Sequence, residues 1–150
     1  MLSLVARRMI PATPDQVFRA WTDAGELQKW FGPKGVSCIG AEVDLRVGGR
    51  YRIGNQFTDG RVVWIAGEFE RIERPRELVY TWNIEPDFAK PERVVVRFEQ
   101  RGADTEVVVV HERIPDAAIR DRHAEGWDGC FDGLERLFSA SRPGPSRSAD

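Results

Sequence analysis

Alternating apolar and polar positions extend over residues 36–111 and predict that about half of the chain is β-sheet. An earlier run, Leu2–Ile10, is rich in β-forming residues, ends at Pro11 and predicts an opening strand. Six further strands are expected at residues 36–45, 50–57, 62–72, 78–83, 94–99 and 105–111. Short turn sequences such as Gly48-Gly49 and Thr58-Asp59-Gly60 join successive runs. The pattern therefore favours one antiparallel meander.

The period of two also assigns side chains to the two faces of the sheet. The inner face is expected to carry Tyr51, Ile53, Leu78, Tyr80, Trp82, Val94, Val96, Phe98, Val107, Val109 and His111. The outer face is expected to meet water through Arg50, Arg52, Arg93, Arg97 and Glu99. The face of Trp64 depends on whether a β-bulge separates it from Phe69.

Helical signals appear at three places. Thr13 is a good N-cap ahead of Pro14, and Gln16 completes a capping box, so a short helix is expected to begin there. A second short helix is expected to begin near Asp23 and to end at Gly32-Pro33. The third is a long helix over residues 115–139, whose apolar stripe is formed by Ile119, His123, Trp127, Cys130, Leu134 and Leu137.

Three glycines inside the long helix need an explanation, because each costs about 1 kcal/mol relative to alanine. One explanation for Gly126, Gly129 and Gly133 is close packing against the sheet or a neighbouring helix. The alternative is that Gly126, on the apolar stripe beside Trp127, leaves room for a ligand between helix and sheet. The sequence leaves both explanations open.

Composition and charge narrow the class of protein. The 150 residues fit one domain, expected at 1–140, followed by a disordered tail at 141–150. The 22 basic and 24 acidic side chains are nearly balanced and alternate in sequence, which argues against a nucleic-acid partner. No apolar run approaches the ~18 residues of a membrane span and none resembles a signal peptide, so we expect a cytoplasmic protein without a membrane partner.

Several motifs, taken in order, resemble those of one family. They are Ile10–Thr22, Leu27–Pro33 with its Trp-Phe-Gly-Pro end, the Asp44–Tyr51 turn, Gly67–Phe69, Pro75–Trp82, and Gly126-Trp127 with Leu134. On these residues the chain, from about Leu4 to Phe138, resembles the single-domain relatives of the Hsp90-ATPase-activator C-terminal domain, within the START-like (SRPBCC) superfamily. The resemblance implies an α+β, Bet v 1-like helix-grip fold. In that fold about seven antiparallel strands curve around the long helix, with two short helices between strands one and two.

The resemblance limits the function without fixing it. Members typically keep an apolar cavity between the sheet and the long helix, and many bind small hydrophobic molecules, which is the function we expect here. Two alternatives stay open. One is a co-chaperone-type stimulator of an Hsp90-like ATPase, with that chaperone as partner. The other is a cyclase- or dehydratase-like enzyme acting on a cyclic or polyketide-like substrate. A shared fold does not by itself supply a mechanism.

Aromatic and polar residues of the inner face are the candidate ligand-binding residues. They are Tyr51, Trp64, Tyr80, Trp82, Phe98, His111, His123, Trp127, Cys130 and Phe131. Rings with polar tips suit a ligand cavity, and they equally fill a core. His111 and His123 either orient or protonate a ligand together, or are two independent polar groups.

Other chemistry is not expected. No third ligand accompanies the two histidines at a telling spacing, so the sequence predicts no metal site. Cys38 and Cys130 lie far apart and match no zinc pattern, and Cys130 is expected to be a small buried apolar residue. We find no nucleophile elbow, phosphate loop or dinucleotide fingerprint, and therefore expect no cofactor and no catalytic constellation. We expect a monomer or weak homodimer.

Overall fold

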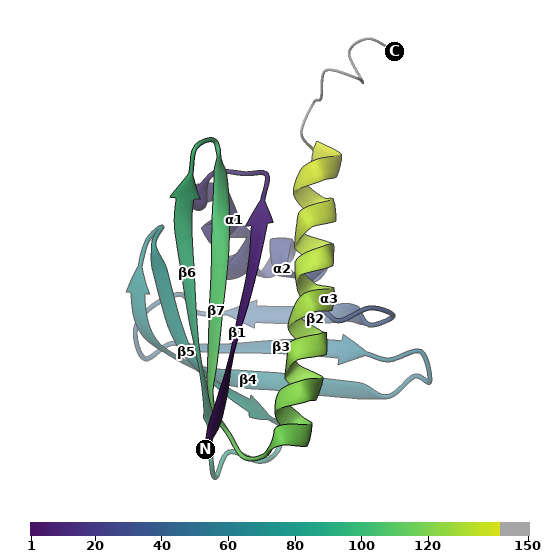
Figure 1. Ribbon diagram of the computed structural model, residues 1–150. Helices are drawn as coiled ribbons and strands as arrows, with labels where there is room; N and C mark the ends of the chain where they lie inside the picture. Colours follow the sequence, from purple (N-terminus) through teal and green to yellow (C-terminus); the bar gives the residue numbers. More distant parts are fainter. Residues whose placement is uncertain (142–150) are drawn as a thin grey trace.

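Residues 1–141 are described by the computed structural model of the chain (Figure 1). The predicted tail, residues 141–150, lies outside the described residues apart from Ser141. The elements are β1 (Leu2–Ile10), α1 (Pro14–Thr22), α2 (Ala24–Trp30), β2 (Ser37–Val43), β3 (Arg50–Gln56), β4 (Val62–Glu73), β5 (Glu77–Ile84), β6 (Glu92–Arg101), β7 (Asp104–Ile114) and α3 (Ala117–Ser141).

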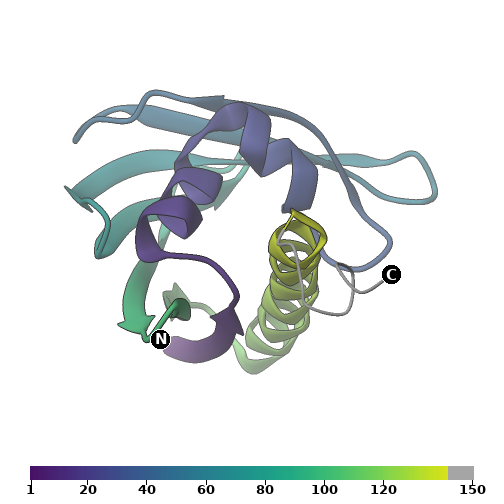
Figure 2. The same ribbon diagram turned by 90° about the horizontal axis from the view of Figure 1, so that it is seen from above.

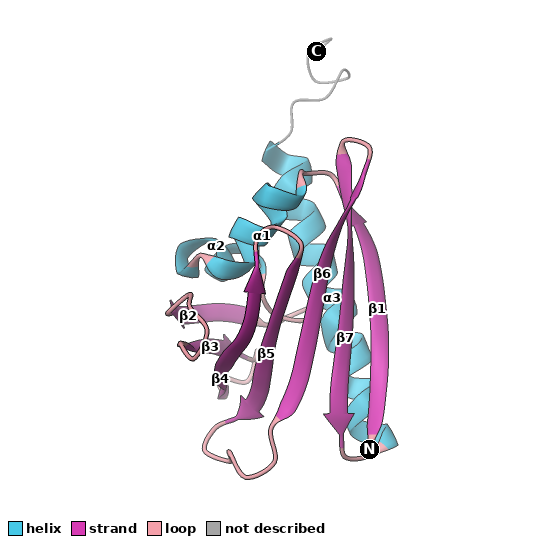
Figure 3. Ribbon diagram, turned by 90° about the vertical axis from the view of Figure 1, so that its left-hand side faces the viewer, coloured by secondary structure: helices cyan, strands magenta, loops and turns pink. Residues whose placement is uncertain are grey.

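The seven strands form one antiparallel sheet in the order β1-β7-β6-β5-β4-β3-β2. Strands β2 to β7 follow one another as the predicted meander, and β1 pairs with β7 at the edge. The sheet twists so strongly that β2, β3 and β4 run across the direction of β1, β6 and β7 (Figures 1 and 3). Seen from above, it curves around one side of the molecule, with α3 on its concave side (Figure 2). This is the predicted α+β helix-grip fold.

Local capping interactions begin each helix where the sequence predicts. The Thr13 hydroxyl accepts the backbone N–H of Gln16 at 3.2 Å, and the Gln16 side chain accepts the N–H of Thr13 at 2.9 Å. This reciprocal pair is the predicted capping box. Asp23 separates α1 from α2 by accepting the N–H of Glu26, and Asp116 accepts the N–H of Ile119 in the first turn of α3.

The predicted inner face of the sheet is the buried face. Leu78, Val94, Val96, Val107, Val109 and His111 have no exposed surface, and Tyr51, Ile53, Tyr80, Trp82 and Phe98 are buried with them. Trp64 lies on the opposite face, because the irregularity in β4 falls between Phe69 and Arg71, beyond both residues. The Arg52 guanidinium covers the Trp64 ring at 3.8 Å.

Two of the three helical glycines allow close packing. A Cβ on Gly129 would lie 2.7 Å from the backbone nitrogen of Lys34, and one on Gly133 would lie 2.5 Å from the carbonyl oxygen of Trp30. The backbone around the end of α2 therefore lies directly against α3. On the other side of the helix, the Arg8 guanidinium of β1 binds the carboxylates of Asp128, Asp132 and Glu135 at 2.8–3.0 Å.

No helix within residues 1–141 is long and apolar enough to cross a membrane.

Candidate functional site

An apolar cavity of about 170 Å³ lies between the sheet and the first half of α3. Its walls come from β3, β4, β5, α3 and the segment after α2, through residues that include Phe31, Asn55, Ile65, Trp82, His123, Gly126 and Trp127. A Cβ on Gly126 would meet no atom within 4 Å. Gly126 therefore faces open space, unlike Gly129 and Gly133, whose surroundings match the close-packing explanation.

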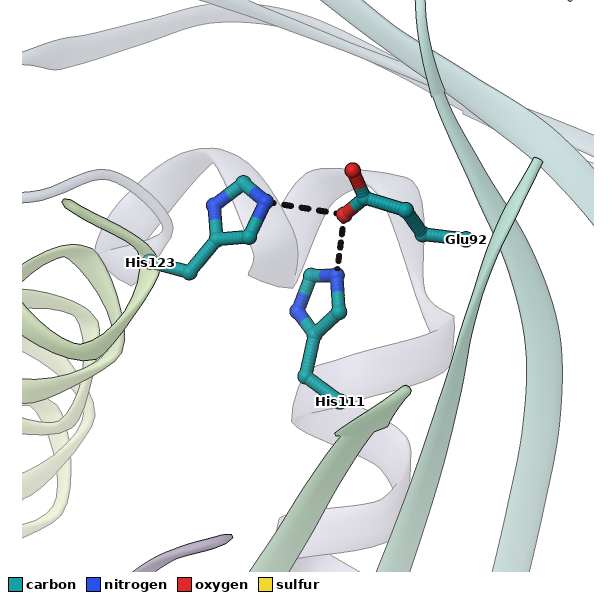
Figure 4. A group of neighbouring side chains, drawn as sticks. All are labelled: Glu92, His111 and His123. Carbon is teal, nitrogen blue, oxygen red and sulfur yellow. Dashed lines mark hydrogen bonds and ion pairs between the residues drawn. The ribbon is translucent and has the colours of Figure 1, made fainter. Parts of the chain in front are cut away.

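Three titratable side chains meet at one edge of this cavity. Glu92, at the start of β6, accepts the Nε2–H of His111 (β7) at 2.7 Å and that of His123 (α3) at 2.8 Å, both on the same carboxylate oxygen (Figure 4). The two imidazole rings stack nearly parallel, with their centroids 4.4 Å apart. We call Glu92, His111 and His123 the triad. It joins strands β6 and β7 to α3 beside the cavity.

The protonation of His111 follows from its second nitrogen. The indole N–H of Trp127 points to Nδ1 of His111 at 3.0 Å, and an indole N–H only donates. Nδ1 must then be an acceptor, so the proton of this neutral ring sits on Nε2 and is donated to Glu92. Burial lowers the pKa of His111, against the opposing effect of the Glu92 carboxylate.

Glu92 is ionised at neutral pH. Burial on its own would raise the pKa of this carboxyl group, but the hydrogen bonds from His111 and His123 outweigh it and bring the pKa to about 2. An ionised carboxylate only accepts hydrogen bonds, so His123 also donates from Nε2. The triad is therefore one carboxylate held by two imidazole N–H groups.

The triad also brings three potential metal-ligating atoms within 4.8 Å of one another, although the sequence predicts no metal site. The hydrogen bond from Trp127 conflicts with metal binding. If Nε2 of His111 bound a cation, its Nδ1 would carry the ring proton, and that proton would face the indole N–H of Trp127 across 3.0 Å. The side chains present fit a hydrogen-bonded triad better than a metal centre.

Two polar atoms in the cavity walls have no hydrogen-bond partner among the described residues. They are the Trp82 Nε1–H, a donor, and the Asn55 Oδ1, an acceptor, and both residues are more than nine-tenths buried. A buried polar group without a partner costs about 1–3 kcal/mol. Both atoms are themselves shielded from solvent, so they belong to wall residues without lying on the accessible surface of the cavity.

The ten predicted ligand-binding residues occupy different surroundings. Trp82, His123, Trp127 and Cys130 line the cavity, and His111 lies directly behind it through its contacts with Trp82 and Trp127. Tyr51 and Tyr80 pack together around a space of only about 10 Å³. Phe98 packs on Phe18 and Trp21, and Phe131, itself on α3, packs beside Trp127. Trp64 lies on the other face of the sheet.

Glu92 and Asn55 are the functional candidates that the sequence prediction missed. The strand that contains Glu92 was expected to begin at Val94, whereas β6 begins at Glu92. Glu92 has the same parity as Val94, Val96 and Phe98, so a strand longer by two residues would have predicted its inward direction. Asn55 likewise continues the alternation of Tyr51 and Ile53.

Cys130 has the properties of a structural residue. It is buried, its sulfur accepts the backbone N–H of Gly32 at 3.4 Å, and burial raises the pKa of its thiol to about 12. The reactive thiolate form is therefore scarce at neutral pH.

A second, larger groove of about 670 Å³ lies between the end of α2 and the second half of α3. It is lined by charged residues such as Lys29, Lys34, Asp132 and Arg136, and by none of the ten predicted residues. We therefore place the candidate site at the smaller cavity, which His123 of the triad lines.

The fold and the cavity under α3 define a helix-grip protein, and comparisons with known proteins identify its family. The sequence profile of the family described as "Activator of Hsp90 ATPase homolog 1-like protein" matches residues 11–139. The chain therefore belongs to this family, as its motifs indicated. No functionally curated protein matches it.

Solved structures agree with this assignment. Protein CV1439 from Chromobacterium violaceum is 25% identical with a TM-score of 0.83, over 91% of this chain and 96% of that one. The AHSA1 protein from Silicibacter pomeroyi has a TM-score of 0.84 at 20% identity, over 94% of this chain and 100% of that one. An Hsp90 activator from Plasmodium falciparum, PFC0360w, is 25% identical with a TM-score of 0.73, over 93% and 97% of the two chains.

Proposed function

We propose that this protein binds a small hydrophobic molecule in the cavity between the sheet and α3. The observation that carries the proposal is the space that Gly126 leaves open, because a glycine inside a helix is unfavourable and the other two are accounted for by contacts with Pro33, Lys34 and Trp30. The cavity of about 170 Å³ is close in size to one of roughly 150 Å³ that takes up benzene in another protein. It is below the roughly 300 Å³ at which drug-sized pockets begin.

The walls of the cavity favour a mostly apolar ligand that carries few polar groups. Phe31, Val63, Ile65 and Trp127 supply aromatic and aliphatic surface, and burying a ligand against it is favourable by about 25 cal/mol per Å². His123 adds one polar side chain at the cavity surface. This combination favours a ligand of about one ring.

Replacing Gly126 with phenylalanine is expected to weaken ligand binding at least tenfold, because the new ring occupies the cavity. The Trp82 and Trp127 indoles lie in the cavity wall, so tryptophan fluorescence and backbone amide shifts in NMR titrations report binding of single-ring hydrophobic compounds.

The matched control is Gly126→Ala, whose single methyl group points into open space and should leave binding nearly unchanged. Equal affinities of the wild type and Gly126→Phe would place the ligand elsewhere. No response to any compound of a broad hydrophobic panel would remove the proposal.

A co-chaperone function is the second candidate, and membership of the Hsp90-activator-like family is the observation that favours it. On this hypothesis the purified chain captures an Hsp90-type ATPase in a pull-down and raises its rate of ATP hydrolysis severalfold. Gly126→Phe should leave both readouts unchanged, because the cavity is not needed for this activity. Absence of both capture and stimulation would exclude the co-chaperone function.

A further inference from the structure

The second nitrogen of the His123 ring is a polar atom of the triad that remains available on a cavity-lining residue. Nε2 of this ring is held by Glu92 at 2.8 Å, whereas Nδ1 has no hydrogen-bond partner among the described residues. Figure 4 shows Nδ1 on the side of the ring turned away from Glu92. His123 lines the cavity, and its side chain is 18% exposed. A ligand in the cavity therefore lies against a histidine whose tautomer is already determined.

The hydrogen bond to Glu92 determines which nitrogen of His123 can accept. Because Nε2 carries the proton donated to Glu92, Nδ1 of the ring presents a lone pair. His111 on β7 is neutral. Arg122 on α3 also lines the cavity, but its side chain is exposed, so its charge is screened by solvent.

We infer that the cavity selects a compact aromatic molecule carrying one acidic O–H group, of the phenol class, and that Nδ1 of His123 accepts the hydrogen bond from this group. The inference rests on the proposed function and adds the chemical class of the ligand. A carboxylate ligand is disfavoured, because its charge would lie close to that of Glu92. A purely apolar ligand would leave Nδ1 of His123 without a partner.

Phenol and toluene provide a matched pair of probes, because they have the same number of heavy atoms and differ in the O–H group. Toluene is the more hydrophobic of the two, so a cavity without a polar partner would prefer it. We expect wild-type protein at pH 8, where phenol is still protonated, to bind phenol about tenfold more tightly than toluene in NMR titrations. Long-range ¹H–¹⁵N spectra of the imidazoles should show a shift of His123 Nδ1 with phenol and none with toluene.

His123→Phe keeps a ring at this position and removes both nitrogens, so the tenfold preference for phenol should disappear while toluene still binds. Glu92→Gln keeps an acceptor oxygen and removes the charge, so the preference should fall to a few fold. The wild-type imidazole spectra test the inference even where a variant folds poorly.

Each outcome separates the two proposals. Preferred binding of toluene, with His123 Nδ1 unmoved by phenol, would overturn the ligand class and leave hydrophobic binding in place. An unchanged phenol preference in His123→Phe would also overturn the role of His123. If neither probe binds, the phenol class is wrong, and the broad panel with Gly126→Phe then decides separately whether the cavity binds any hydrophobic molecule.

Discussion

Gly133→Ala is expected to lower the free energy of unfolding by about 2 kcal/mol, although alanine is the better helix former by about 1 kcal/mol. The added methyl group would lie 2.5 Å from the carbonyl oxygen of Trp30, a backbone atom that moves only if α2 moves. Trp30 is itself fixed, because its indole donates to the carbonyl of Ala20 at 2.9 Å and its ring packs on Trp21. Steric strain should therefore exceed the gain in helix propensity. Urea unfolding followed by circular dichroism measures the difference.

Gly126→Ala is the matched control for this prediction, since it places the same methyl group on the same helix. Its Cβ meets nothing within 4 Å, so helix propensity should dominate and stabilise the protein by about 0.5–1 kcal/mol. The two substitutions should thus have opposite signs. A stabilising Gly133→Ala would show that α2 and α3 are not in the close contact described here.

The order of the strands and the two faces of the sheet were predictable because they depend on local rules. The period of two placed Leu78, Val96 and Val109 on the buried face, and the capping box at Thr13 fixed the start of α1. These signals act within a few residues of the chain and need no tertiary contact to be recognised.

The candidate site depends on longer-range contacts, so the sequence indicated it only in part. Glu92 follows Pro91 and precedes Arg93, a charged and turn-like context, and it becomes a strand residue because Arg93 pairs with Glu112 of β7. The same register pairs Val94 with His111, which brings the carboxylate of Glu92 to the imidazole 19 residues further along the chain. Only the strand register makes these two residues neighbours.

The sequence pattern also does not distinguish an inward-facing aromatic residue that lines a cavity from one that fills the core. Tyr80 and Trp82 share a strand and a face, yet Tyr80 packs against Tyr51 and Phe69 while Trp82 borders the cavity. Their periodicity is identical. The difference comes from α3, where Gly126 leaves open the cavity that Trp82 also borders, and the two residues lie more than 40 positions apart in the chain.

Acid is expected to destabilise the protein through Glu92 between about pH 4.5 and pH 2. The pKa of this carboxyl group falls from the ordinary 4.5 to about 2 in the fold, so the unfolded chain takes up the proton first as the pH falls. Its contribution to stability is therefore complete above pH 4.5 and is lost as the pH falls through about 2. The difference corresponds to on the order of 3 kcal/mol.

His111 also makes the fold less stable as the pH falls, and its effect begins at a higher pH than that of Glu92. Burial lowers its pKa below 6.5, so the unfolded chain again binds the proton first, and stability begins to fall below about pH 6.5. Glu92 also raises the pKa of His111, so the two titrations are coupled, and the comparison of Glu92→Gln with the wild type at low pH reports on the two groups together.

Glu92→Gln should cost on the order of 3 kcal/mol at pH 7 and almost nothing near pH 2, because the wild-type carboxylate has then lost its charge as well. Urea unfolding of both proteins at several pH values gives this difference directly. Glu68→Gln is the matched control, since Glu68 is an exposed carboxylate on β4, and its difference from the wild type should stay within about 0.5 kcal/mol throughout. A gap for Glu92→Gln that does not close as the pH falls would mean that its cost is steric, and that the two histidines do not hold a carboxylate charge in the fold.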